Sequence, residues 1–98
     1  MNTAAMLSLL KVDLGIVTTI YDERLTCLLD AAKGYIETEG VSLSPEISID
    51  DANLIIMYAA YLWRRRDMGD ADGQYARMPR MLRWALNNRI FAEKMREP

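Results

Sequence analysis

The sequence predicts an all-α fold, a small multihelical domain with two long antiparallel helices, a short N-terminal helix and a C-terminal helix. Three observations lead to this fold class. Apolar residues recur every three or four positions in the long segments, and capping residues stand where helices should begin. The one run of alternating apolar residues contains Pro45, which would interrupt a sheet. A chain of 98 residues with 51% hydrophobic and 27% charged residues fits a single globular domain over residues 1–98.

The first two helices are expected at residues 4–11 and 20–39. The first is short, and Gly15 ends it at the latest. The second is amphipathic and closes at Gly40, because its apolar residues share one face while its charged residues fall mostly outside that face. The apolar face consists of Tyr21, Leu25, Leu28, Leu29, Ala32, Tyr35 and Ile36.

Two further helices are expected at residues 49–67 and 79–91. Ser48, followed three residues later by Asp51, forms an N-terminal capping signature for the third helix. Pro79 suits the first turn of the last helix, because the N–H group that proline lacks would have no hydrogen-bond acceptor within the helix at that position. The segment between these helices contains two glycines and is expected to be a loop.

The third helix has almost no polar face. One of its sides carries Ile55, Ile56, Ala59, Leu62 and Trp63. A chain this short has few other helices with which to cover both sides, so we expect one side to contact a second subunit. We favour the opposite side as the subunit interface, because it is rich in tyrosine and methionine, which are typical of contact surfaces. The candidate subunit-interface residues are Leu54, Met57, Tyr58 and Tyr61 on this side, together with Trp63 at the end of the helix.

The composition excludes the commonest catalytic and metal-binding chemistry. The chain has no histidine and a single cysteine, Cys27, so it cannot form an intrachain disulfide, a thiolate-rich metal site or a histidine-activated nucleophile. Cys27 lies one residue outside the apolar face of its helix, and we expect a small, partly buried thiol. We therefore expect no enzymatic activity, cofactor or metal. The absence of a signal peptide and of a membrane-spanning run indicates a soluble intracellular protein.

Charged residues gather where the third helix ends. Three consecutive arginines occupy its last turns, where cations complement the helix dipole, and an acidic loop follows. This loop resembles a calcium-binding loop only superficially, because Met68 and Pro79 stand at the first and twelfth positions, where oxygen ligands are required. Ion pairing at the helix end, a partner contact and nucleic-acid binding are all open roles for the arginines.

Four segments follow one another in an order that is characteristic of a known family. Residues 6–13 form a short leading helix, and residues 22–37 form a long helix with an alanine-rich middle and a Tyr-Ile-Glu ending. Residues 59–66 end a second apolar helix in aromatic residues followed by arginines, and residues 78–89 form a proline-led helix. In this order the chain resembles the small head–tail connector (adaptor) proteins of tailed bacteriophages.

The resemblance implies a structural function in a phage or prophage. Copies of the chain would form a ring, matching the symmetry of the portal protein, that joins the DNA-filled head to the next neck or tail protein. DNA would only pass through the channel, no membrane would be involved, and the protein would lie in the virion neck after assembly in the bacterial host cytoplasm. The candidates for a partner contact or a channel lining are Arg64, Arg65, Arg66, Asp67, Asp70 and Asp72.

Two other classes of protein remain open. A small helical regulator could bind nucleic acid with the Arg64–Arg83 region, although the net charge of −2 disfavours it. An enzyme is disfavoured because neither a nucleophile–base pair nor a ligand cluster can be assembled without histidine, but a site built from paired carboxylates stays open.

Overall fold

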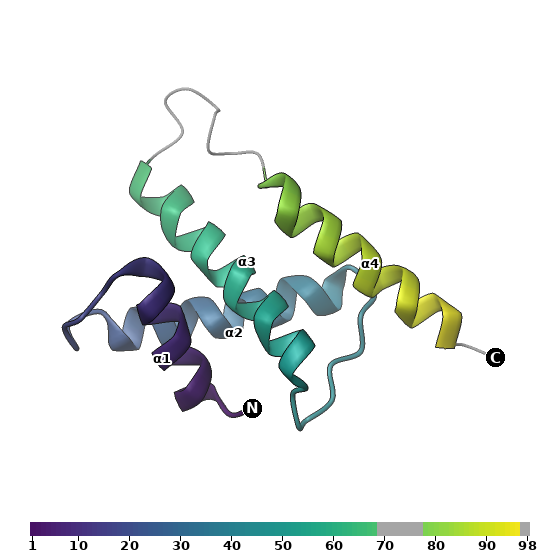
Figure 1. The fold of residues 1–98 in the computed structure, drawn as a ribbon, viewed down its shortest axis with the longest axis horizontal. Helices are drawn as coiled ribbons and strands as arrows, with labels where there is room; N and C mark the ends of the chain where they lie inside the picture. Colours follow the sequence, from purple (N-terminus) through teal and green to yellow (C-terminus); the bar gives the residue numbers. More distant parts are fainter. Residues whose placement is uncertain (69–77, 97–98) are drawn as a thin grey trace.

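The computed structural model describes residues 1–68 and 78–96, and within these ranges the chain is all-α, with no strand. The prediction of fold class is therefore confirmed. Its helices are α1 (Thr3–Leu14), α2 (Asp22–Thr38), α3 (Ile49–Met68) and α4 (Arg80–Arg96) (Figure 1). Each lies over one of the expected segments. The largest difference is at α4, which continues to Arg96, beyond the expected end at residue 91.

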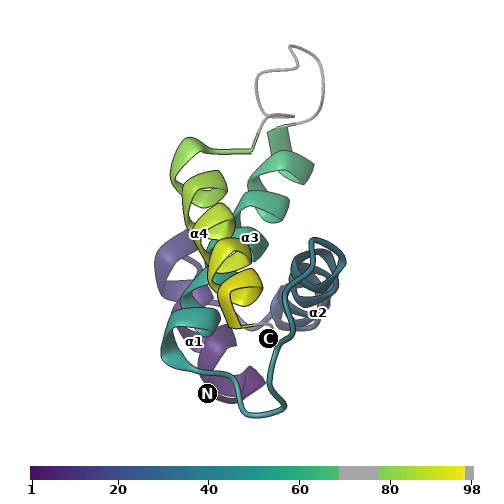
Figure 2. The same ribbon diagram turned by 90° about the vertical axis from the view of Figure 1, so that its right-hand side faces the viewer.

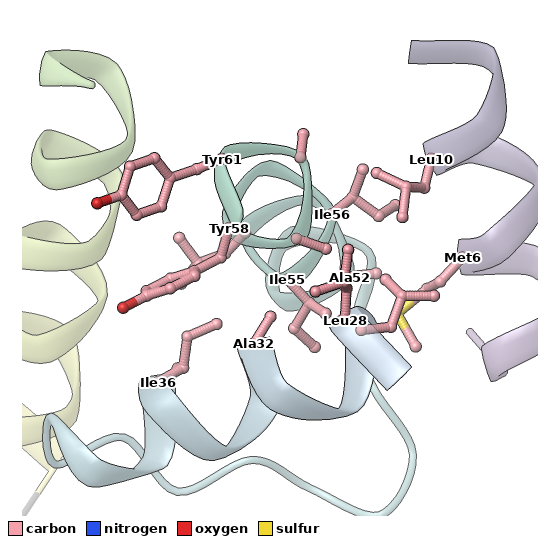
Figure 3. Close-up of a cluster of buried hydrophobic side chains, with 14 of the residues drawn as sticks. Met6, Leu10, Leu28, Ala32, Ile36, Ala52, Ile55, Ile56, Tyr58 and Tyr61 are labelled. Carbon is pink, nitrogen blue, oxygen red and sulfur yellow. The ribbon is translucent and has the colours of Figure 1, made fainter. Parts of the chain in front are cut away.

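The two long helices α2 and α3 cross each other. In Figure 1, α2 runs horizontally behind α3, which rises diagonally across it, and Figure 2 looks almost along α2 while α3 rises beside it. Ala32 and Ala52 are both fully buried where these helices meet, and their small side chains allow a close approach (Figure 3). The expected antiparallel pair of long helices is thus not found. Instead, α4 runs back alongside α3 (Figures 1 and 2).

Helix α3 forms the centre of the core and packs against each of the other three helices. Its position explains its two apolar sides, because water is excluded on both. Figure 3 shows side chains from α1 and α2 converging on it. The largest fully buried side chains are Met6, Leu10, Leu25, Leu29, Ile36, Ile55, Leu82 and Leu86.

The helix ends follow local capping rules. The Asn2 side chain accepts a hydrogen bond of 2.8 Å from the Ala5 N–H at the start of α1. The helix ends at Gly15, which adopts φ 72°, a left-handed conformation that is easiest for glycine. The Ser48 hydroxyl oxygen accepts a hydrogen bond of 3.2 Å from the Asp51 N–H, which confirms the capping signature predicted for α3.

Replacing Ser48 with alanine should lower the free energy of unfolding by about 1 kcal/mol, because an N–H group at the start of α3 loses its acceptor. Urea titration followed by circular dichroism measures this loss. The matched control is Ser48→Asn, which keeps a side-chain oxygen and should retain most of the stability. If Ser48→Asn lost as much as Ser48→Ala, the cap would not be the cause.

Candidate functional site

Most of the α3 face that we expected to contact a second subunit is buried within a single chain. Leu54 is only 4% exposed, and Tyr58 and Tyr61 are each 8% exposed. Figure 3 shows both tyrosines pointing from α3 towards α4. The expectation that so short a chain could not cover both sides of α3 was wrong, because α4 packs along the side that α1 and α2 leave open. Of the expected interface residues on this face, Met57 alone is not buried.

Aromatic contacts hold this part of the core together. The Tyr58 ring stacks on Tyr35 with centroids 5.6 Å apart and meets Tyr61 edge-on at 6.0 Å. Trp63, the last expected interface residue, is half-buried and meets Tyr21 edge-on at 5.3 Å. Burial raises the pKa of the Tyr58 hydroxyl above its ordinary value, and the negative charge of nearby Glu39 adds to the increase. Tyr58 therefore stays neutral at physiological pH and serves packing.

Of the six charged residues proposed for a partner contact or a channel lining, two have side chains in the described part of the structure. Arg64 and Arg65 are exposed at the end of α3. The side chains of the other four lie outside the described part of the structure: Arg66, Asp67, Asp70 and Asp72. The role expected for this segment therefore remains a prediction.

Two hollows lie along the line where α4 meets α3, and Met57 lines both of them. The first has a volume of about 330 Å³ and is lined by residues of α3 and α4 such as Tyr61, Arg64 and Met81, together with Asp13 of α1. The second has a volume of about 450 Å³ and is lined mainly by Leu54, Met57, Trp84, Ala85, Asn88 and Ala92. The part of the expected interface that remains accessible is thus a groove between α3 and α4.

Helix α4 carries a second apolar stripe on the side facing away from the core. We call it the outer stripe. It consists of the apolar residues Met81, Trp84, Phe91 and Met95 with the polar Asn88 at its middle, and these positions recur at spacings of three and four. On a helix these positions fall within an arc of about 80°. Met81, Trp84, Phe91 and Met95 are 69%, 64%, 64% and 70% exposed. Exposed large apolar side chains in one row indicate a contact surface.

A second exposed apolar surface lies at the opposite end of the molecule. The corner patch, as we call it, is formed by Leu9, Val12, Val17, Ile20 and Tyr21, on α1 and the connection to α2. Val17 is 92% exposed and Ile20 is 79% exposed. Figure 1 shows this connection at the left-hand end of the long axis, whereas α4 extends to the right-hand end. Neither surface was predicted from the sequence, because apolar periodicity alone does not show which of two apolar rows the core covers.

Basic and acidic residues are distributed unevenly along the chain. Helix α4 has five basic residues and one acidic residue, a net charge of +4. Residues 1–63 contain three basic and nine acidic residues, a net charge of −6. The outer stripe therefore lies on a basic helix, whereas residues 9–24, which include the corner patch, have three acidic and two basic residues, a net charge of −1.

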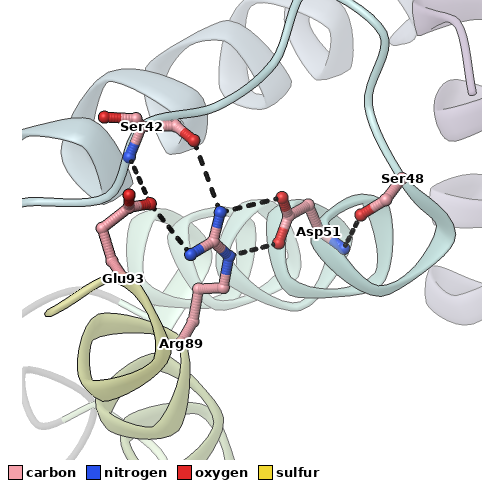
Figure 4. A network of polar contacts seen from close by, with 5 residues as sticks. All are labelled: Ser42, Ser48, Asp51, Arg89 and Glu93. Carbon is pink, nitrogen blue, oxygen red and sulfur yellow. Dashed lines mark hydrogen bonds and ion pairs between the residues drawn. The ribbon is translucent and has the colours of Figure 1, made fainter. Parts of the chain in front are cut away.

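A polar network fastens α4 to the start of α3 (Figure 4). Arg89 donates hydrogen bonds of 2.7 and 3.3 Å to the two carboxylate oxygens of Asp51 and one of 3.0 Å to Glu93. It also donates to the Ser42 carbonyl oxygen at 3.4 Å, and Glu93 accepts from the Ser42 N–H at 3.0 Å. The hydrogen bond to Asp51 raises the pKa of the Arg89 guanidinium above its ordinary value, so this group stays charged. This network was not predicted from the sequence, since no local signal links Arg89 to Asp51 or Ser42.

The residue types that bind metals do not gather in the described part of the chain. Residues 1–68 and 78–96 contain no group of three or more histidine, cysteine or acidic residues that could hold a metal ion. Cys27 is exposed, so the expectation of a partly buried thiol was wrong; its position outside the apolar face turns it towards solvent. No helix in the same ranges is long and apolar enough to cross a membrane.

Comparison with known proteins does not place the chain in a family. No protein-family model, curated protein or solved structure matches it. The function is therefore inferred from the surfaces of the chain itself. These are the outer stripe with its adjoining groove, and the corner patch at the other end.

Proposed function

We propose that this protein is the structural subunit of a ring that connects the DNA-filled head of a tailed phage or prophage to its tail. The observation that carries the proposal is the pair of exposed apolar surfaces at opposite ends of an all-α chain whose long axis measures 45 Å. In a ring, each subunit presents one surface to the next copy and a different surface to the previous copy. A chain with two such surfaces is suited to that geometry.

The order of the helices supports the same proposal through its resemblance to head–tail connectors. A connector needs to bind neighbouring proteins and has no reaction to catalyse. The proposed partners are other copies of the chain, the portal protein and the next neck or tail protein, with DNA passing through the channel. The proposed location is the neck of the virion.

A nucleic-acid-binding regulator is the second candidate, and the net charge of +4 on α4 is the observation that favours it. Two of the basic residues on α4 are engaged within the chain, however. Arg83 lies 3.2 Å from a carboxylate oxygen of Glu39, and Arg89 is held by Asp51. Cations already paired with carboxylates contribute less to phosphate binding. The connector is therefore the function that we favour.

Deleting the gene from the phage tests the proposal. We expect DNA-filled heads that fail to join tails or that lose their DNA, because the ring between portal and tail would be missing. Electron microscopy of the products, with quantification of packaged DNA, measures this outcome. Supplying the intact gene from a plasmid should restore complete virions. Normal virions accompanied by altered transcription would reject the connector and favour the regulator.

A further inference from the structure

We infer that copies of this protein contact one another head to tail, with the outer stripe of α4 in one copy packed against the corner patch of the next. The biological setting of this contact depends on the proposed connector function. The two surfaces themselves are defined within the single chain. The chemistry of both surfaces, their positions and their charges all favour a second copy as the occupant.

The positions of the surfaces favour a head-to-tail contact. In Figure 1 the connection between α1 and α2 lies at one end of the long axis and α4 lies towards the other. Figure 2, which views the molecule from the right-hand end, has α4 in front. Two unlike surfaces at opposite ends generate a repeating contact, because every added copy leaves one surface of each kind open. Such a contact closes into a ring when the rotation between copies allows it.

The charges favour this pairing over a contact between two copies of α4. An α4–α4 contact would bring together Arg80 and Lys94 of two copies, which are exposed and form no ion pair with a described residue. Docking on the corner patch instead places these cations beside residues 9–24, which have a net charge of −1 and include the exposed carboxylates of Asp13 and Glu23. Like-charge juxtaposition opposes the first arrangement, and opposite charge favours the second.

Individual charged residues beside the two surfaces extend this complementarity. Arg80 and Lys94 lie along one edge of the outer stripe, and Asp13 and Glu23 lie beside the corner patch. All four are exposed, and none forms an ion pair with a residue in the described ranges. They are therefore available to pair across the contact between two copies.

The polar residues within the two surfaces also match. Asn88 interrupts the outer stripe at its middle, and Thr18 and Thr19 interrupt the corner patch between Val17 and Ile20. All three polar residues are exposed in the single chain. An amide on one surface and hydroxyl groups on the other can hydrogen-bond when the apolar residues around them pack. This would favour one register of the contact over others.

Chemical cross-linking between introduced cysteines tests the contact. Cys27→Ser removes the exposed native thiol, and Val17→Cys and Phe91→Cys then place one thiol on each surface. These positions lie towards opposite ends of the molecule, so a short bismaleimide should join them only between copies. We expect the double variant V17C/F91C to give a ladder of dimers, trimers and larger species at about 1 mM protein, where weak contacts are populated.

The matched controls identify which surfaces meet. The variant T38C/F91C moves one thiol to the far end of α2, at the exposed Thr38, and should give no ladder. Each single variant should give no cross-linked ladder, because only one of the two meeting surfaces then carries a thiol. Efficient dimers from F91C alone would overturn the proposal in favour of an α4–α4 contact. Absence of a ladder from V17C/F91C, with native circular dichroism, would also overturn it.

Mixing two disrupted variants gives an independent readout. Phe91→Glu damages only the outer stripe, and Val17→Glu damages only the corner patch, because both side chains are exposed in the single chain. In sedimentation experiments at high concentration, neither variant alone should associate. A mixture should form dimers, since one intact surface of each kind is then present. No association in the mixture would contradict the head-to-tail contact.

These measurements separate the contact from the connector function. A deletion that leaves unjoined heads, together with no cross-linked ladder, would retain the connector and reject this contact. A cross-linked ladder, together with normal virions after deletion, would retain the contact and reject the connector.

Discussion

Replacing Ile55 with alanine is expected to lower the free energy of unfolding by about 3 kcal/mol, within a range of about 2 to 5 kcal/mol for such core truncations. Ile55 is fully buried on α3, the helix that packs against all three others. The truncation removes apolar contacts and leaves a cavity that neighbouring helices can fill only partly. Since small domains are stabilised by about 5 to 15 kcal/mol in total, this is a large fraction.

Urea unfolding followed by circular dichroism measures the effect of Ile55→Ala, and the midpoint should fall with little change in slope. The matched control is Ile49→Ala, the same substitution on the same helix, where the side chain is 67% exposed. It should change stability by less than about 1 kcal/mol. Equal losses in the two variants would show that α3 is not the centre of the core.

Replacing Arg89 with methionine is expected to lower the free energy of unfolding by about 2 kcal/mol and to loosen α4. Without the guanidinium, the carboxylates of Asp51 and Glu93 lose their shared cation. The Arg89 and Asp51 side chains are only 17% and 12% exposed, so water replaces the lost contacts incompletely. Breaking a fully buried pair costs about 3 to 5 kcal/mol, and the partial exposure here reduces that figure.

Amide hydrogen exchange should report faster opening of α4 in Arg89→Met than in the wild type, alongside the loss in urea. Arg83→Met is the matched control, because Arg83 lies on the same helix in an exposed ion pair with Glu39. It should cost less than about 1 kcal/mol. Arg89→Lys keeps the charge without the two-pronged geometry and should fall between wild type and Arg89→Met. A loss no larger than that of Arg83→Met would mean that the network does not hold α4 in place.

The sequence by itself determined the features that depend on neighbours along the chain. Spacings of three and four identified the five buried residues of α2, although Tyr21 and Tyr35, which were assigned to the same face, are exposed. Gly15 marked the latest possible end of α1. The Ser48 cap was predicted because it acts within one turn of its own helix. These interactions are local, so residue type and spacing are sufficient to identify them.

Only the tertiary structure decided which surfaces are covered and which remain open. The two apolar sides of α3 led us to expect a subunit interface at Tyr58 and Tyr61, yet α4 covers these residues within the same chain. The exposed rows that include Val17 and Phe91 were not distinguished from core residues in the sequence. The physical reason is that apolar periodicity shows how a helix divides into faces, whereas the burial of a face depends on how distant helices cross and on long-range contacts such as those of Arg89.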